Sequence, residues 1–227
     1  MEDGCQERLE AAFNASTDGE MIRGVSEGIL LADDLVENTP LLRTAVGRDL
    51  RGHIRRAGVM FRLRDLSTRG DLPYIADIVP MPYGNWHWLE IKSGNFKAHV
   101  CRSVGPFEFP EETLSRQDAR LANQFDLFGG KVVPISEALA KIPELYAWLT
   151  FAPTRDGSLQ HLCWAMPPAD QGDWLAHIDI MDRAAKSGIA PTDGKPPEAP
   201  APEIKLRFKE HIEESLVEKN KPDKKNN

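Results

Sequence analysis

The sequence predicts an α+β fold in which N-terminal helices pack on an antiparallel β-sheet made of two hairpins plus extra strands. Up to residue 69 the apolar side chains recur at helical spacing, and beyond residue 70 the pattern changes to short alternating runs that are typical of strands. Glycine-containing turns separate two pairs of these runs. Because strands joined by tight turns are antiparallel neighbours, we expect an α+β rather than an α/β arrangement.

The chain is expected to divide into three parts. Residues 1–187 are predicted to form one globular domain, with a helical part at 1–69 and a sheet-rich part at 70–187. Residues 188–202 read GIAPTDGKPPEAPAP, a composition that favours an extended linker. Residues 203–227 are expected to hold a short amphipathic segment followed by a disordered tail.

Composition indicates a cytoplasmic protein without a membrane anchor. The acidic N-terminus lacks the basic and apolar regions of a signal peptide, and no apolar run approaches the length of a membrane span. Three widely separated cysteines without CxxC spacing favour free thiols in a reducing compartment. The sequence carries no nucleotide-binding, zinc-protease or calcium-loop motif, so no cofactor is expected.

The helical part is predicted to contain three helices. Residues 5–15 and 17–36 form the first two, and Thr17 with Glu20 three residues later is a candidate capping box. The third spans residues 39–69, with Thr39 as its N-cap and Pro40 at its first position. The apolar series at helical spacing is expected to be its buried face: Leu42, Val46, Leu50, Ile54 and Phe61. Its glycines indicate either a helix break or close packing against another backbone: Gly47, Gly52 and Gly58.

Positive charge is concentrated in the third helix. Residues 39–69 hold eight arginines and two acids, whereas the whole chain has a formal net charge of -7. An arginine-rich face can bind phosphates or carboxylates. It can also pair with acids of the same chain, and the segments 27–37 and 108–112 are candidate partners. The expected binding residues are Arg48, Arg51, Arg55 and Arg62 on the helix, with Trp88 and His99 on a strand face.

The sheet-rich part is predicted to begin with a strand at Tyr74–Val79, followed by a hairpin. In this hairpin HWLEIK and FKAHVCRS flank a Gly94-Asn95 turn, which pairs Ile91 with Ala98 and Leu89 with Val100. The same register places Glu90 opposite His99, a favourable pair across strands.

Further elements follow the hairpin. A helix is expected from Pro110, with Leu114, Leu121, Ala122 and Phe125 as its apolar stripe, and then a short strand at 131–134 and a helix from Ser136. A second hairpin joins YAWLTFAP and LQHLCWAM through Asp156-Gly157, pairing Phe151 with Leu162 and Leu149 with Trp164. The run WLAHIDI is predicted to be a last strand.

One pattern suggests catalysis. Asp77 precedes Glu90-Ile91-Lys92 by thirteen residues on the neighbouring predicted strand. An Asp and a Glu-x-Lys on adjacent strands resemble the core of the PD-(D/E)xK nuclease superfamily. That resemblance implies a divalent metal held by Asp77 and Glu90, with Lys92 positioning the attacking water.

Two other patterns are weaker predictors of function. His99, Cys101, His161 and Cys163 form a metal site only if the two hairpins face each other on that side. The linker and amphipathic segment are typical of a tethered element that folds on contact with a partner. The leading hypothesis is therefore a non-enzymatic accessory or regulatory protein of a bacterial cytosol. It would bind a protein or nucleic acid through the arginine-rich face, and a metal-dependent nuclease is the alternative.

Overall fold

The computed structural model describes residues 3–123, 144–170 and 172–188, and the structural statements below concern these residues. Its helices are α1 (Asp3–Ala12), α2 (Asp18–Asn38), α3 (Ala45–Asp49), α4 (Arg51–Arg69), α5 (Leu114–Arg120) and α7 (Ile180–Lys186), with 3₁₀ turns η1 (Ala15–Thr17) and η2 (Leu121–Asn123). Its strands are β1 (Ile75–Pro80), β2 (His87–Ser93), β3 (Phe96–Arg102), β4 (Leu145–Pro153), β5 (Leu159–Met166) and β6 (Ala176–Asp179). The predicted α+β class is confirmed.

The strands form one sheet in the order β1-β2-β3-β4-β5-β6. All neighbours are antiparallel except β3 and β4, which run parallel, with Phe96 opposite Leu145. The sheet is thus mostly antiparallel, as predicted, and the β3–β4 pair is the exception that the sequence did not indicate. The chain leaves β3 at Arg102, passes through α5 and enters β4 at the end of the sheet where β3 began, so that the two strands run parallel.

Both predicted hairpins are confirmed in register. Ile91 lies opposite Ala98, and Glu90 lies opposite His99 across β2 and β3. Phe151 pairs with Leu162 and Leu149 with Trp164 across β4 and β5. The turn glycines Gly94 and Gly157 have φ angles of 57° and 94°, a region that other residues rarely adopt.

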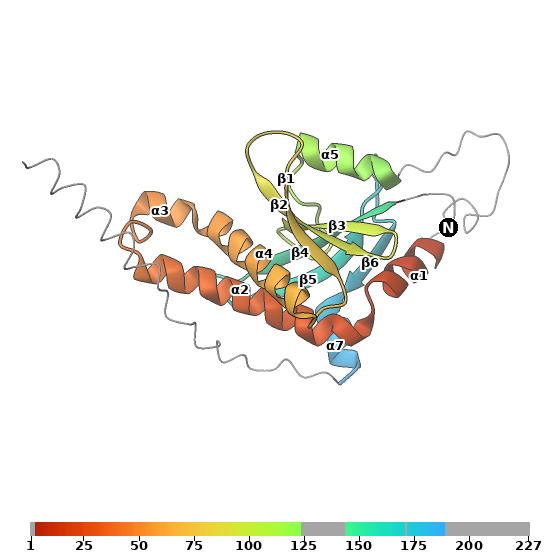
Figure 1. The fold of residues 1–227 in the computed structure, drawn as a ribbon, viewed down its shortest axis with the longest axis horizontal. Helices are drawn as coiled ribbons and strands as arrows, with labels where there is room; N and C mark the ends of the chain where they lie inside the picture. The colour runs from red at the N-terminus through yellow and green to blue at the C-terminus, as the bar shows by residue number, and fades with distance from the viewer. Residues whose placement is uncertain (1–2, 124–143, 171, 189–227) are drawn as a thin grey trace, which may run out of the picture. The chain divides into compact units, whose positions relative to one another are not determined.

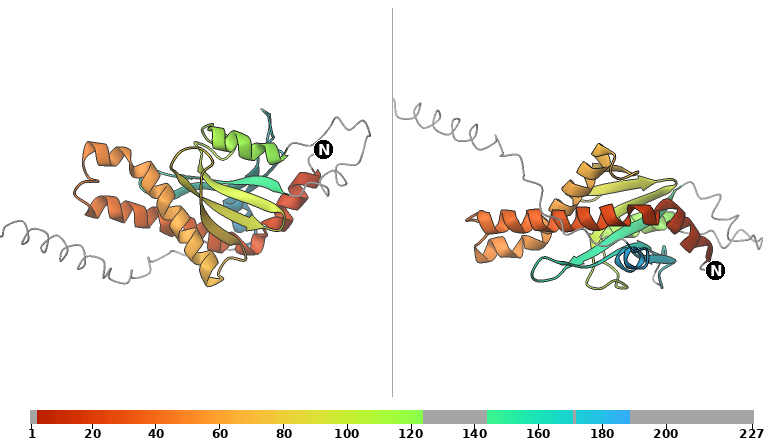
Figure 2. Two further views of the ribbon diagram at one scale, coloured as in Figure 1. Left: turned by 45° about the horizontal axis from the view of Figure 1, so that its top comes forward. Right: turned by 90° about the horizontal axis from the view of Figure 1, so that it is seen from below.

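Helices cover both faces of the sheet (Figures 1 and 2). On one face, residues of α1, α2, α4 and α7 join the sheet in the main apolar core, which includes Phe13 stacked on Trp164 at 3.8 Å between ring centroids. On the other face, Ala119 and Ala122 of the α5 region pack against a smaller cluster that contains Tyr146 and Trp148. Because β4 lies at the centre of the sheet between the two layers, each of its nine residues is buried.

The helix starts differ from the predictions. Asp3 begins α1 and Asp18 begins α2, but Thr17 makes no side-chain cap, so the proposed capping box with Glu20 was wrong. Thr17 is the last residue of the preceding 3₁₀ turn, so its hydroxyl donates instead to the Asn14 carbonyl. The same hydroxyl lies 2.6 Å from the Tyr74 hydroxyl.

The basic segment 39–69 is not one continuous helix. Thr39 ends α2 rather than capping a new helix, and residues 39–44 form a turn. Thr44 caps α3, since its hydroxyl accepts a hydrogen bond from the Gly47 amide at 3.1 Å. Leu50 then separates α3 from α4.

The apolar series predicted to face the core was also wrong. Val46, Leu50 and Phe61 are 74%, 46% and 60% exposed, whereas the buried apolar positions of α4 are Val59, Leu63 and Leu66. Val59 is buried next to Gly58, where α4 contacts Gly28 of α2, as described below. Helical spacing alone could not choose between these two apolar stripes.

Two later predictions need correction. Thr113 caps α5, which begins at Leu114 rather than Pro110, and Leu114 and Leu121 of the expected stripe are exposed. The last strand stops at Asp179, whose side chain caps α7, so Ile180 is helical. The predicted strand at 131–134, the helix from Ser136, Phe125 and residues 189–227 lie outside the described residues.

A close backbone contact joins α2 and α4. A Cβ atom added at Gly58 would lie 2.3 Å from the Gly28 carbonyl oxygen, and one added at Gly28 would lie 2.6 Å from the Val59 Cα. For Gly58, the prediction of close packing is confirmed. Gly52 differs, since its added Cβ would meet only the flexible Arg102 guanidinium, at 2.9 Å.

We therefore expect Gly58→Ala to destabilise the protein by about 1 to 3 kcal/mol, although alanine is the better helix former. Gly52→Ala in the same helix is the matched control and should be neutral or slightly stabilising. Urea denaturation followed by circular dichroism measures both free energies of unfolding. Equal values for the two variants would show that the α2–α4 contact relaxes without cost.

Candidate functional site

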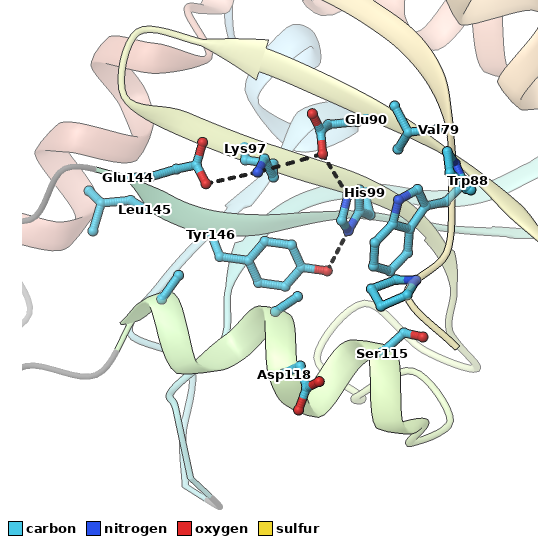
Figure 3. A pocket seen from close by; sticks show the side chains of 14 residues that line it. Val79, Trp88, Glu90, Lys97, His99, Ser115, Asp118, Glu144, Leu145 and Tyr146 are labelled. Carbon is cyan, nitrogen blue, oxygen red and sulfur yellow. Dashed lines mark hydrogen bonds and ion pairs between the residues drawn. The ribbon is translucent and has the colours of Figure 1, made fainter. Parts of the chain in front are cut away.

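A pocket of about 490 Å³ lies between the sheet and α5. Strands β2, β3 and β4 form one wall, α5 forms the opposite wall, and the end of β1 with Pro82 after it completes the lining (Figure 3). Two of the predicted binding residues, Trp88 and His99, line it together with Glu90 of the alternative catalytic set.

A row of polar side chains crosses this sheet face. Glu90, His99 and Trp148 occupy facing positions on β2, β3 and β4, so their side chains project to the same side. The Glu90 Oε2 atom lies 3.6 Å from His99 Nε2, and His99 Nδ1 lies 2.9 Å from the Tyr146 hydroxyl. That hydroxyl also accepts a hydrogen bond from Trp148 Nε1 at 2.8 Å.

These contacts favour one tautomer of His99. The Tyr146 hydroxyl already accepts from Trp148, so its own proton is best used in donating to His99 Nδ1. The proton of the neutral ring then sits on Nε2, where it faces the Glu90 carboxylate. Burial lowers the pKa of His99, and the neighbouring carboxylate only partly offsets this, which favours the neutral ring.

Glu90 is the most strongly perturbed acid of the pocket. The His99 ring, and then the ammonium groups of Lys92 and Lys97, hold the pKa of the Glu90 carboxyl down at about 2, against the opposing effect of burial. Lys92 Nζ lies 3.0 Å from Glu90 Oε1, and Lys97 Nζ lies 3.6 Å from Oε2 and 2.8 Å from Glu144. The carboxylate is thus ionised and already surrounded by positive charge and N–H groups.

Trp88 stacks on His99 with 3.5 Å between ring centroids. Only 7% of Trp88 and 2% of His99 is exposed, so neither can contact a large partner directly. Trp88 Nε1 is buried without a hydrogen-bond partner among the described residues, whereas His99 Nε2 faces Glu90 Oε2 at 3.6 Å. A buried N–H group without a hydrogen bond costs free energy of folding, which is why such groups are rare in protein cores.

The alternative catalytic residues are only partly brought together. Asp77 is exposed and lies directly opposite Glu90 in the β1–β2 register, whereas Lys92 is half exposed and bonded to Glu90. In the described ranges no group of three or more His, Cys, Asp or Glu side chains has a geometry that could hold a metal ion. Asp77 and Glu90 would therefore supply two carboxylates without a third protein ligand.

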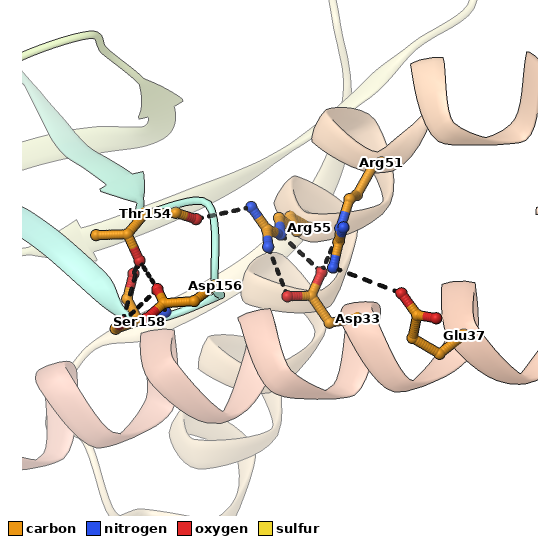
Figure 4. A network of polar contacts seen from close by, with 7 residues as sticks. All are labelled: Asp33, Glu37, Arg51, Arg55, Thr154, Asp156 and Ser158. Atoms are coloured by element: carbon orange, nitrogen blue, oxygen red, sulfur yellow. Dashed lines mark hydrogen bonds and ion pairs between the residues drawn. The ribbon is translucent and has the colours of Figure 1, made fainter. Parts of the chain in front are cut away.

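Most of the predicted arginine face is paired with acids of α2. Arg55 binds Asp33 through two hydrogen bonds of 2.7 and 2.6 Å, and Arg51 reaches the same carboxylate at 3.0 Å (Figure 4). Although burial opposes it, the guanidinium groups of Arg55 and Arg51 lower the pKa of Asp33. Arg55 also contacts the Thr154 carbonyl, which ties the helix to the β4–β5 turn.

Arg62 and Arg48 have different environments. Arg62 pairs with Glu27 at 2.5 Å and with Asp65, and its side chain is 12% exposed. Arg48 is exposed on α3. None of the four predicted binding arginines lines the pocket, so the arginine face and the Glu90 site are separate surfaces. Arg51, Arg55 and Arg62 bind acids of segment 27–37, one of the two segments predicted to supply internal partners.

Sequence reasoning missed several residues of the pocket: Lys97, Ser115, Asp118, Glu144 and Tyr146. The sequence could have predicted that Tyr146 and Trp148 share one face of β4, because polar or amphipathic side chains alternate with apolar ones along this strand. No local pattern indicated Asp118, which reaches the pocket only because α5 crosses the second face of the sheet. The parallel β3–β4 pairing, which brings Tyr146 beside His99, was likewise not predicted.

Comparisons of this chain with protein-family models, curated proteins and solved structures find no match. None of the helices in the described part of the chain is both long and apolar enough to cross a membrane.

The Glu90 environment predicts a pH-dependent contribution to stability. Because the pKa of Glu90 is depressed in the folded state from an ordinary value of 4.5, its contribution is present at neutral pH and is lost as pH falls from about 4.5 towards 2. Glu90→Gln should be less stable than the wild type at pH 7, by an amount that shrinks over this range. Denaturant titrations at several pH values measure the difference, which should be smaller in a Lys97→Met background. A difference that stays constant down to pH 2 would contradict the ion pairing.

Proposed function

We propose that this chain is a non-enzymatic accessory protein that binds another protein through the end of its helical arm. The arm consists of α2, α3 and α4, and its tip is defined as residues 39–50. The tip extends past the sheet (Figure 2), where a partner can approach it without meeting the rest of the domain. The observation that carries the proposal is the set of large apolar side chains that the tip exposes.

Three large apolar residues of the tip are exposed. Leu41, Val46 and Leu50 are 72%, 74% and 46% exposed, and Leu35 of the adjoining α2 turn is 51% exposed. Single exposed apolar residues are ordinary on protein surfaces, but several within one short segment favour an interaction site. Burying one such side chain contributes roughly 1.5 to 3 kcal/mol, so three or four suffice for a specific contact.

The charge of the tip indicates the chemistry of the partner. Arg43 and Arg48 are exposed and contact no acid among the described residues, and Asp49 is the single acid of the tip. Arginines that flank an apolar patch suit a partner surface that is acidic at its edge and apolar at its centre. Arg51, Arg55 and Arg62 are excluded from this role, because their acid partners on α2 already satisfy them.

The tip also has a fixed conformation, which reduces the entropy lost on binding. The Thr44 hydroxyl donates to the Leu41 carbonyl at 2.7 Å and accepts from the Gly47 amide. Gly47 packs so tightly that an added Cβ would lie 2.4 Å from the Leu42 Cα. A rigid tip with solvent-exposed apolar side chains is the property expected of a preformed docking surface.

A site-specific cross-link tests the proposal. With a benzophenone amino acid at position 46, irradiation of cells should yield an adduct to one particular protein. Arg43→Glu with Arg48→Glu should abolish this adduct through charge repulsion. Arg64→Glu is the matched control, because Arg64 is an exposed arginine of α4 outside the tip, and it should leave the adduct unchanged. Mass spectrometry identifies the attached protein.

Three outcomes would contradict the proposal. A cross-link only to nucleic acid would favour the polyanion interpretation of the arginines. A cross-link only to a second copy of this chain would make the tip a self-association surface. Equal adducts in the tip variant and in the Arg64→Glu control would show that the tip charges do not select the partner.

A nuclease remains the second candidate, since Asp77 lies directly opposite Glu90 on the neighbouring strand. A hydrolase of this kind requires Mg²⁺- or Mn²⁺-dependent cleavage of DNA or RNA. Asp77→Asn and Glu90→Gln should each abolish the cleavage, while Asp182→Asn on α7 should retain it. Intact nucleic acid after incubation with the wild-type protein and either metal would exclude this candidate.

We further infer that the protein acts in the cytoplasm. Cys5, Cys101 and Cys163 are free, buried thiols, and burial raises the pKa of Cys163 to about 12. Thiols of this kind behave as small apolar core residues and are compatible with a reducing compartment.

A further inference from the structure

The sheet is split between the start of β2 and the end of β3. Pairing of these two strands stops at Glu90 and His99. Residues 87–89 of β2 remain paired with β1, and residues 100–102 of β3 remain paired with β4, but the two runs do not pair with each other. Their facing edges therefore lack the hydrogen bonds of a continuous ladder. This split lies outside the tip, and arginine side chains from three elements surround it.

Two arginines reach the split from opposite faces of the sheet. Arg56 belongs to α4, on the face of the main core, and donates a hydrogen bond to the His87 carbonyl at 3.4 Å. Arg116 belongs to α5, on the other face. Their charges interact: burial lowers the pKa of Arg56, Cys101 opposes this, and the charge of Arg116 lowers it further. The same two charges act on the Cys101 thiol, so both guanidinium groups lie near that residue.

Neither arginine has a carboxylate partner among the described residues. Arg116 donates to the backbone carbonyl of Glu111, and the carboxylate of the next residue, Glu112, pairs instead with Arg120 at 3.2 Å. The Nε atom of Arg56 is buried without a hydrogen-bond partner in this part of the chain. Because a buried donor of a charged group costs free energy when it is unpaired, an acceptor that reaches Arg56 would be bound favourably.

A third arginine adds to the positive charge. A Cβ atom added at Gly52 would lie 2.9 Å from Arg102 Nη1, so the Arg102 side chain lies against α4 one turn before Arg56. The Cys101 thiol does not balance these charges, because burial raises its pKa above the ordinary value of 9.0, although Arg116 and Arg56 act in the opposite direction. At neutral pH the thiol is therefore uncharged, whereas the guanidinium groups are all charged.

The arginine cluster, defined as Arg56, Arg102 and Arg116, suits one class of ligand. Guanidinium groups bind phosphate oxygens through paired N–H donors, and such charge-assisted hydrogen bonds are stronger than neutral ones. A dianion offsets more of the repulsion within the cluster than a monoanion, whereas a metal ion or an amine would be repelled. Arg56 and Arg116 are half-buried and Arg102 is exposed, so a ligand can reach the cluster from solvent. We propose that this cluster binds a dianionic phosphate group, either free phosphate or the phosphate of a small monoester.

Isothermal titration of the full chain at about pH 8 tests this proposal, because phosphate monoesters are dianions there. Inorganic phosphate and glycerol 3-phosphate are the probes, and dimethyl phosphate is the monoanionic comparison compound at the same ionic strength. We expect the dianions to bind at least about tenfold more tightly than dimethyl phosphate. Tighter binding of inorganic phosphate would identify free phosphate as the ligand, and tighter binding of glycerol 3-phosphate would identify a phosphorylated molecule.

Matched variants separate the cluster from general attraction to exposed arginines. Arg56→Lys keeps the positive charge but loses the paired donors, so it should weaken phosphate binding about tenfold. Arg64→Lys is the control, because Arg64 is an exposed arginine of α4 outside the cluster, and it should leave the affinity unchanged. Arg56→Met and Arg116→Met should each abolish binding.

Thermal unfolding establishes that the variants without binding are folded. Because Arg56 has no carboxylate partner among the described residues, Arg56→Met should melt at or above the wild-type temperature, and added phosphate should raise only the wild-type value. Arg55→Met should melt at a lower temperature, since it removes a partner of Asp33. The absence of heat and of a thermal shift with both dianions, equal binding of dimethyl phosphate, or equal affinities of Arg56→Lys and Arg64→Lys would overturn the proposal.

Discussion

The contact between Gly28 and Gly58 determines how the helical half of the protein is arranged. With no side chain on either residue, the backbones of α2 and α4 meet directly, and a single methyl group would lie 2.3 Å from a carbonyl oxygen. The close approach also brings the carboxylates of α2 beside the arginines of α4. Asp33 pairs with both Arg55 and Arg51, and Glu27 pairs with Arg62, within the arm itself.

The same contact fixes which face of α4 meets the sheet. Val59, Leu63 and Leu66 enter the core, and a second apolar series that includes Leu50 and Phe61 is left in solvent. An excess of apolar residues over what the core can bury is a reason to expect a partner for the arm. The charge concentration in residues 39–69 therefore includes an internal part, Arg51, Arg55 and Arg62, that is paired with α2, and exposed arginines such as Arg43 and Arg48 at the tip and Arg64 on α4.

The second face of the sheet has a different organisation. There the strands carry polar and aromatic side chains, and α5 covers them incompletely, so a pocket remains above Glu90, His99 and Tyr146. The neutral His99 ring links an ionised carboxylate to a buried phenol whose pKa is raised well above its ordinary value of 10 by burial. Such a network fixes side-chain positions, and it does so at the wall of the cavity rather than in the core.

The sequence by itself determined the strands, the hairpin registers and the α+β class. Alternation with period two and a glycine turn leave few possible pairings, which is why Glu90 opposite His99 was predicted correctly. Only the tertiary structure decided which stripe of α4 is buried, that β3 and β4 are parallel, and that Asp118 joins Glu90 around one pocket. These features depend on contacts between residues far apart in the chain, such as Gly28 with Gly58, and local periodicity holds no information about them.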